Sequence, residues 1–254
     1  MLMAKYSIEV KNLVKEYGNN RVVDDISFSV KEGEIFGILG PNGVGKTTTL
    51  EMIETMLPID GGTALVLGID VYKKPRDVKF LIGVQTQHPA FMEKVTLIEQ
   101  IEQMASAYGI RPDVQALLGD VGLVSKASEF VEDLSGGQRQ RFSVAVALAH
   151  NPKVLFMDEP TTGLDPQARH NMWEMIFKIK KRGVTVVLTT HYMEEAEVLC
   201  DRVAIMDQGK IVAIDTPEQL IKSLLSSGFK KRQIVEKANL EDVVLMLTGR
   251  YLRD

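Results

Sequence analysis

The sequence predicts an α/β fold built around a mostly parallel sheet. Between residues 154 and 206, short apolar segments alternate with helical ones, which is typical of right-handed βαβ crossovers. Residues 35–39 are apolar on both faces, as a covered central strand should be, and run directly into a glycine-rich loop. Residues 89–150 carry helical patterns. A chain of 254 residues has room for one large domain or two small ones.

The N-terminal region predicts strands followed by one helix. Residues 7–13 and 26–30 alternate apolar and polar side chains, so both are expected to be strands. A helix is expected after the glycine-rich loop, over residues 49–57. Pro58 and the glycine pair at 61–62 predict the end of that helix.

The helical block is inserted between two strand-rich blocks, so it predicts a subdomain rather than a separate domain. Its first helix has an apolar stripe from Leu97 to Tyr108 at spacings of three and four. Two more helices are expected over residues 112–121 and 136–150. Strands are then expected over residues 154–157, 184–189, 202–206 and 210–214, with helices over residues 166–181 and 192–199.

These elements predict a single domain, residues 1–254. Its core comprises residues 1–88 and 151–216, its helical subdomain residues 89–150, and its short helical tail residues 217–254.

Composition excludes several classes of protein. Hydrophobic residues make up 45% and charged residues 25%, as in an ordinary globular protein, and no apolar run approaches the roughly 20 residues that span a bilayer. The start of the chain is too short and too polar for a signal peptide, so a cytoplasmic location is expected. A net charge of −4 without a basic arm gives no support to nucleic-acid binding. The single cysteine, Cys200, excludes an internal disulfide.

The glycine-rich loop, residues 40–47, fits the phosphate-loop pattern in full, with an apolar strand before it and a helix after it. Its backbone N–H groups are expected to surround phosphates, and the positive end of the following helix favours the same anion. Lys46 is expected to bridge phosphate oxygens and Thr47 to ligate Mg²⁺. The predicted nucleotide contacts here are Gly40, Pro41, Asn42, Gly43, Val44, Gly45, Lys46, Thr47 and Thr48.

Asp158 and Glu159 follow a buried strand at its carboxyl end, which is the edge where parallel α/β sheets bind ligands. Asp158 is expected to hold Mg²⁺ through a water, and Glu159 to orient and deprotonate an attacking water as general base. The alternative, that one of the two merely caps the next turn, is disfavoured by the complete phosphate loop upstream.

The run Leu134-Ser135-Gly136-Gly137-Gln138 predicts an anion site at a helix N-terminus. An ordinary serine cap would account for Ser135 but not for the pentapeptide. Together with the phosphate loop before it and Asp158-Glu159 after it, this run resembles the ATP-binding subunits of ABC transporters. The resemblance extends from about Tyr6 to about Gly249.

The resemblance implies a P-loop NTPase (RecA-like) core with an N-terminal antiparallel β subdomain and an inserted α-helical subdomain. It also implies that ATP and Mg²⁺ are bound, and that two ATP molecules lie across a head-to-tail dimer. Ser135, Gly136, Gly137 and Gln138 would then contact the nucleotide of the opposite subunit. Because both motifs look intact in this chain, a homodimer is expected.

Four further residues match positions of the same family. Tyr17 matches the aromatic residue that stacks on adenine, and His191 the histidine that bonds the γ-phosphate. Gln87 matches the glutamine that contacts Mg²⁺ and the attacking water, with Gln85 as a competing candidate. Asp165 matches the loop that crosses the dimer interface, although it is equally suited to cap the helix that starts at residue 166.

A finer resemblance, to the ATPases of drug and antibiotic exporters, rests on residues 188–202 and on the tail segments 239–244 and 247–250. It implies a separate membrane permease as partner and a peripheral location on the inner face of the cell membrane. Phe91 and Met92 are candidates for contacts with that permease, or else they pack within the helical subdomain. The alternatives are a soluble ABC ATPase acting on the ribosome or DNA, and a P-loop kinase.

Overall fold

The computed structural model describes residues 6–227 and residue 229. By its internal contacts the chain divides into two units, residues 1–220 and 221–254. The described strands lie in the first unit, which carries the candidate site. The tail segments 239–244 and 247–250 lie outside the described residues.

The first unit contains two sheets. The smaller has four strands in the order β2-β1-β4-β5, and its pairs are antiparallel. The larger has the order β10-β9-β3-β8-β7-β6, in which the pair β9–β10 is antiparallel and the other pairs are parallel. The strands are β1 (Tyr6–Tyr17), β2 (Asn20–Lys31), β3 (Ile35–Leu39), β4 (Gly61–Val66), β5 (Ile69–Asp70), β6 (Ile82–Gln85), β7 (Val154–Asp158), β8 (Thr185–Thr190), β9 (Arg202–Asp207) and β10 (Lys210–Asp215).

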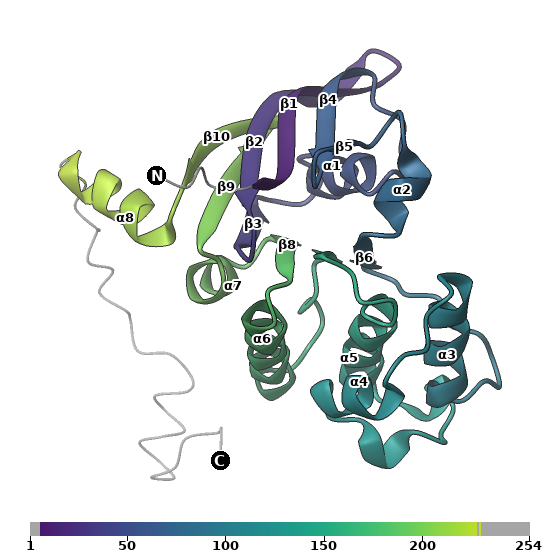
Figure 1. The fold of residues 1–254 in the computed structure, drawn as a ribbon. Helices are drawn as coiled ribbons and strands as arrows, with labels where there is room; N and C mark the ends of the chain where they lie inside the picture. The colour runs from purple at the N-terminus through teal and green to yellow at the C-terminus, as the bar shows by residue number, and fades with distance from the viewer. Residues whose placement is uncertain (1–5, 228, 230–254) are drawn as a thin grey trace, which may run out of the picture. The chain divides into compact units, whose positions relative to one another are not determined.

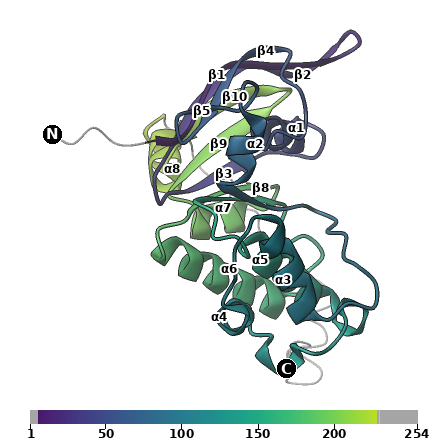
Figure 2. The same ribbon diagram turned by 45° about the vertical axis from the view of Figure 1, so that its right-hand side comes forward.

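Helices connect the parallel strands, and three of them follow β6 as a group (Figures 1 and 2). The α-helices are α1 (Lys46–Ile53), α2 (Pro75–Lys79), α3 (Leu97–Ala107), α4 (Val114–Asp120), α5 (Gly136–Ala147), α6 (Pro166–Lys181), α7 (Met193–Leu199) and α8 (Pro217–Ser226). Short 3₁₀ turns, η1 (Val124–Lys126) and η2 (Val131–Asp133), lie between α4 and α5. Because α3, α4 and α5 lie between β6 and β7 in the chain, the helical block is an insertion into the larger sheet. The exact subdomain boundaries remain predictions.

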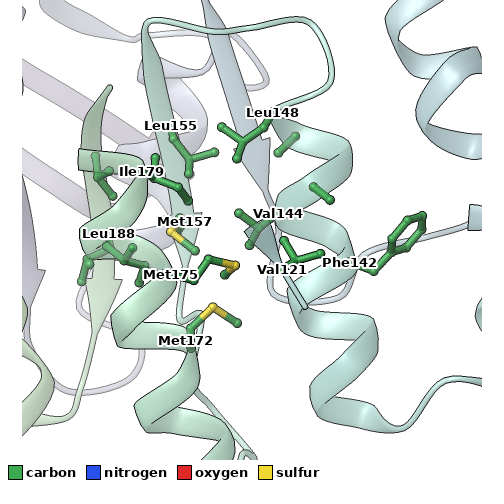
Figure 3. Packing of buried hydrophobic residues seen from close by; sticks show 14 of the residues in the cluster. Val121, Phe142, Val144, Leu148, Leu155, Met157, Met172, Met175, Ile179 and Leu188 are labelled. Carbon is green, nitrogen blue, oxygen red and sulfur yellow. The ribbon is translucent and has the colours of Figure 1, made fainter. Parts of the chain in front are cut away.

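The larger sheet is covered on both faces because side chains along its strands alternate between two cores. Leu155 and Met157 of β7 face a core formed with α3, α5 and α6, part of which is drawn in Figure 3. Val154 and Phe156 of the same strand face the core shared with α1 and the smaller sheet. This arrangement confirms the predicted α/β fold with an antiparallel N-terminal β subdomain.

The segment after α1 differs from the prediction. Gly61 and Gly62, expected only to end a helix, begin β4, and α1 already ends at Ile53. Gly62 has φ +80, and a Cβ there would collide with the backbone oxygen of Asn12 on β1. The glycines are therefore needed for close strand pairing, a cause that local sequence pattern cannot reveal.

Candidate functional site

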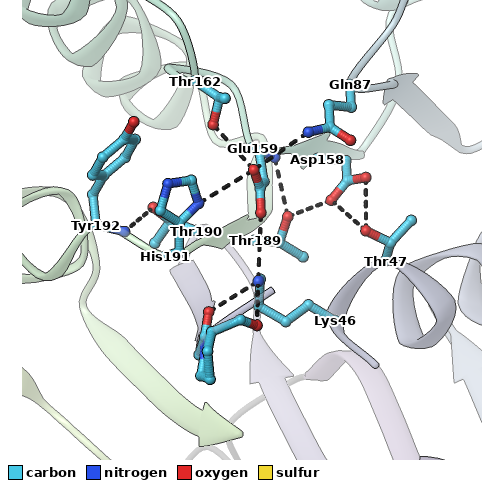
Figure 4. Close-up of polar contacts among 12 residues, drawn as sticks. Lys46, Thr47, Gln87, Asp158, Glu159, Thr162, Thr189, Thr190, His191 and Tyr192 are labelled. Atoms are coloured by element: carbon cyan, nitrogen blue, oxygen red, sulfur yellow. Dashed lines mark hydrogen bonds and ion pairs between the residues drawn. The ribbon is translucent and has the colours of Figure 1, made fainter. Parts of the chain in front are cut away.

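Three strands of the larger sheet bring the candidate residues to one edge. β3, β7 and β8 are parallel neighbours, so their carboxyl ends lie side by side. The phosphate loop follows β3, Glu159 follows β7, and His191 follows β8. Figure 4 shows side chains from these three positions pointing toward one another. Apolar strands thus act as rigid supports for polar groups placed just beyond their ends.

The phosphate loop holds Lys46 tightly. Lys46 is the first residue of α1 and is buried, and its Nζ donates to the backbone oxygens of Gly40 at 2.9 Å and Pro41 at 3.0 Å. The preceding Gly45 has φ +101, and a Cβ there would lie 2.5 Å from the oxygen of Val22 on β2. Glycine at 45 is therefore required both by backbone conformation and by the close approach of β2.

Thr47 and Asp158 form a pair of hard oxygen donors. The Thr47 hydroxyl donates to the two carboxylate oxygens of Asp158, at 3.1 and 3.0 Å. Mg²⁺ is usually held by one or two carboxylates together with waters and phosphate oxygens, rather than by a protein cage. Among the described residues there is no cluster of three or more His, Cys, Asp or Glu residues suited to a metal. The donor set at Thr47 and Asp158 fits Mg²⁺ bound together with a phosphate.

Glu159 is at the centre of the polar contacts. Its backbone has φ +48, an uncommon left-handed conformation for a residue with a side chain. Lys46 Nζ lies 3.4 Å from its Oε1, and His191 Nδ1 lies 3.3 Å from its Oε2. Thr162 and Gln87 donate to the same Oε2, at 3.1 and 3.4 Å.

The pKa of Glu159 results from opposing effects. Burial alone would raise it, because a charged carboxylate loses hydration in the protein interior. The neighbouring His191 imidazole, the Thr162 hydroxyl and the Lys46 charge act in the other direction and outweigh burial. The pKa of Glu159 is therefore lowered, and the side chain is a carboxylate at neutral pH.

Two threonines at the site were missed by sequence reasoning. Thr189 is fully buried at the end of β8, and its hydroxyl donates to Asp158 and accepts from the Glu159 backbone N–H at 3.0 Å. Thr189 thereby connects both Asp158 and Glu159 to the neighbouring strand β8. Thr162, in the loop that follows β7, donates to the Glu159 carboxylate. For Thr189 a signal was available, because Thr189 and Thr190 follow the apolar residues 186–188 at the carboxyl end of β8.

A cavity of about 510 Å³ extends from the phosphate loop. It brings together residues that are far apart in the sequence, including Tyr17, whose side chain is half exposed. Gln87 also lines this cavity, whereas Gln85 is buried in β6 and its amide donates to the Thr86 oxygen. Of the two competing glutamines, the geometry favours Gln87. The lining residues are Tyr17, Val22, Asn42, Gly43, Gly45, Lys46, Thr47, Thr48, Gln87 and Glu159.

The run from Ser135 to Gln138 lies at the N-terminus of α5 and does not line this cavity. Ser135 caps the helix: its hydroxyl accepts from the Gln138 N–H at 3.3 Å, and Gln138 Oε1 accepts from the Ser135 N–H at 2.9 Å. Gly136 lines a second cavity of about 330 Å³, together with Gln87 and Glu159. A Cβ added to Gly136 would meet no atom within 4 Å.

Asp165 caps the other helix at this edge. Its carboxylate accepts from the Ala168 N–H at 2.8 Å, and Pro166 occupies the first turn of α6. The capping function that the sequence allowed for Asp165 is therefore present.

The fold and the site define a P-loop nucleotide-binding protein. Residues 23–162 match the family model described as ABC transporter, and the chain belongs to this family. It is accordingly an ATP-binding protein with ATPase activity.

Similar proteins include the linearmycin resistance ATP-binding protein LnrL of Bacillus subtilis (strain 168), which is 40% identical over 85% of this chain and 71% of its own length. A Nod factor export ATP-binding protein I of Burkholderia orbicola (strain AU 1054) is 37% identical over 99% of this chain and all of its own length. A solved structure described as the ATP-binding subunit of an ABC transporter has a TM-score of 0.77 and 28% identity, covering 95% of this chain and 99% of the other.

Within the described residues, no helix is both long enough and apolar enough to cross a membrane.

Proposed function

We propose that the chain powers export of a substrate through a separate membrane permease, by ATP-driven closure of an ATPase dimer. The proposal of ATP hydrolysis rests on one observation. Contacts join Lys46 to Glu159 and Thr47 to Asp158, beside an open cavity of about 510 Å³. Support for export comes from relatives named for antibiotic resistance and for Nod factor export. The chain would act at the inner face of the cell membrane, attached through the permease.

ATP occupies the cavity with its phosphates in the loop and its base toward Tyr17. The Lys46 ammonium moves from loop carbonyls to phosphate oxygens, while the loop N–H groups and the N-terminus of α1 complete the anion site. Thr47, Asp158 and Gln87 are the residues that would hold Mg²⁺. When bound, Mg²⁺ would neutralise charge on the phosphates.

Hydrolysis needs a water aligned with the γ-phosphate, and Glu159 is the acceptor placed to hold it. Two of the groups that lower the Glu159 pKa, Lys46 and His191, are the same groups expected to bind phosphates. Once they contact the nucleotide, their influence on Glu159 weakens and its affinity for a proton rises. ATP binding thereby strengthens the base that acts on it.

The open space around Gly136 supports a second subunit. Neither backbone conformation nor any neighbour in this chain requires glycine at that position, since its φ is not positive and a Cβ would meet nothing within 4 Å. A group from outside the chain explains why a side chain is missing there. The phosphates of ATP bound to a partner copy fit a helix N-terminus that carries Ser135 and Gly137 as well.

Two residues suggested for permease contact have different surroundings. Phe91 is partly buried and its ring lies 5.4 Å from that of Phe142, so it contributes to packing. The neighbouring Met92 is 58% exposed. Met92 is therefore the better probe of an external partner.

The test is a pull-down of the tagged chain from gently solubilised native membranes, with bound proteins identified by mass spectrometry. We expect a protein with several membrane spans to co-purify. Met92→Asp should weaken this association and leave ATP affinity unchanged. Met56→Asp, a change at another exposed methionine, is the matched control. Ribosomal proteins or nucleic acid in place of a membrane protein would favour the soluble ABC ATPase.

A further inference from the structure

Lys15 on β1 is a buried cation next to the nucleotide cavity. Only 6% of its surface is exposed, and its Nζ donates to the Pro58 oxygen at 3.0 Å and to Asp60 Oδ1 at 3.1 Å. Lysine is rarely buried to this extent without partners. Its Nζ also lies over the ring of Tyr17, 5.4 Å from the ring centroid, which is within the range of a cation–π interaction.

Asp60 also forms hydrogen bonds with the backbone of the residues on either side of Lys15. The Asp60 N–H donates to the Val14 oxygen at 3.1 Å, and Asp60 Oδ2 accepts from the Glu16 N–H at 2.8 Å. The Glu16 N–H and the Lys15 ammonium together lower the pKa of Asp60, so the carboxylate stays charged at neutral pH. The connection from α1 to β4 thereby holds β1 in place directly before Tyr17.

Tyr17 needs such support. Half of its surface is exposed, so on its own the ring would exchange between rotamers. Residues 15 and 17 lie on the same side of the strand, because side chains alternate along β structure. Tyr17 lines the cavity of about 510 Å³ whereas Lys15 does not, so the ammonium contacts the ring from outside the cavity. The ring remains available to a flat group inside the cavity.

We propose that Lys15 is a positioning residue that holds the Tyr17 ring as the stacking surface for the base of the bound nucleotide. Lys15 touches no part of the nucleotide in this account. It acts by restricting the ring before binding, so that less rotamer freedom is lost when the base stacks. The proposal rests on the proposed function insofar as it takes Tyr17 to meet adenine.

A double-mutant cycle separates this role from a structural one. The variants are Lys15→Met, Tyr17→Ala and both together, and the readout is the dissociation constant for ATP by calorimetry. Inorganic tripolyphosphate, which has phosphates but no base, is the second probe. We expect Lys15→Met to weaken ATP binding about tenfold, which lies between the values for an exposed and a desolvated cation–π contact, and to leave tripolyphosphate binding unchanged. In the Tyr17→Ala background, Lys15→Met should change neither the dissociation constant for ATP nor that for tripolyphosphate.

Lys15→Arg, which keeps a cation over the ring, should recover most of the ATP affinity. If Lys15→Met does not fold, Lys15→Gln takes its place, because the amide can still donate to Pro58 and Asp60 but carries no charge. Two outcomes would overturn the proposal in favour of a purely structural lysine. One is that Lys15→Met weakens binding of ATP and of tripolyphosphate equally. The other is that Lys15→Met weakens ATP binding as much in the Tyr17→Ala chain as in the unchanged chain.

Failure of the proposed function has a different signature. If Tyr17→Ala binds ATP as tightly as the unchanged chain does, Tyr17 does not contact the base of the nucleotide. The proposed positioning role of Lys15 is then refuted as well. The membrane pull-down is independent of that result. Absence of a membrane partner would leave the Lys15 cycle intact and refute export alone.

Discussion

At the scale of single residues, Glu159 shows how several weak contacts fix one catalytic candidate. Its left-handed backbone conformation is unfavourable for a residue with a Cβ. The Thr189 hydroxyl stabilises this conformation by accepting a hydrogen bond from the Glu159 N–H. Contacts from Lys46, His191 and Thr162 then orient the carboxylate. A strained backbone held by neighbours is often found where a group must be aimed accurately.

Glu159→Gln tests this assignment. The amide keeps the shape of the side chain but cannot accept a proton from water, so we expect ATP turnover to fall by at least about 10²-fold with ATP affinity retained. Because ATP is then not consumed, a dimer should accumulate with ATP and Mg²⁺, measurable by size-exclusion chromatography with light scattering. Glu174→Gln, at an exposed glutamate on α6, is the control. Unchanged turnover in Glu159→Gln would exclude Glu159 as the base.

At the scale of elements, helix α1 links the nucleotide site to the core between the two sheets. It begins at Lys46 and contacts β2, β4 and β7. Its C-terminal cap, Glu54, is buried with 4% of its surface exposed. Burial, together with repulsion from Asp158 and Glu51, raises the pKa of Glu54 to about 8. Glu54 is therefore protonated in the folded chain at neutral pH.

This protonation makes stability depend on pH. Between pH 4.5 and 8 the folded chain holds a proton on Glu54 that the unfolded chain has released, so the free energy of unfolding decreases as pH rises. The contribution is complete below pH 4.5 and is lost above pH 8. Its size is at most about 3 kcal/mol between pH 5.5 and 8, from 1.36 kcal/mol per pKa unit.

Glu54→Gln resembles the protonated acid and should remove this dependence. We expect urea denaturation without nucleotide to show the variant gaining stability over the unchanged chain as pH rises from 5.5 to 8.5. Parallel curves for the two proteins across this range would mean that Glu54 has an ordinary pKa.

At the scale of the whole molecule, one edge of the chain carries a glycine, Gly136, that its own fold does not explain. The N-terminus of α5 is capped by Ser135 and Gln138, and Gly136 beside them faces open space. A site complete in itself would not need a glycine there. The arrangement is understandable if two copies each complete the other's nucleotide site.

Gly136→Ala separates folding from assembly. Alanine fits the helical backbone and favours it over glycine, by up to about 1 kcal/mol, so the melting temperature should be unchanged or higher. Affinity of the single chain for ATP should also be retained. The ATP-dependent dimer in the Glu159→Gln background should weaken, as should turnover in the otherwise unchanged chain.

Gly119→Ala is the matched control, because Gly119 lies in α4 and a Cβ there makes only ordinary contact with Val124. A Gly136→Ala chain that dimerises as Gly119→Ala does would show that this edge is not the interface.

Much of this molecule follows from local sequence pattern. The apolar strands at 35–39 and 154–158, the phosphate loop and the helix caps each depend on neighbouring residues, so their positions could be read without a structure. The order of these segments also predicts one shared sheet edge, because parallel strands end together.

Contacts between distant parts of the chain account for the rest. Thr189 reaches Asp158 across 31 positions, and Lys15 reaches Asp60 across 45. Position 62 in β4 requires glycine because β1 passes too close for a side chain. Such pairings depend on which backbones lie within a few ångströms of each other, and residue type and spacing along the chain do not encode that distance. The general chemistry of the site is therefore evident in the sequence, while the contacts of Thr162 and Thr189 with Glu159, and of Lys15 with Tyr17, emerge only once the chain has folded.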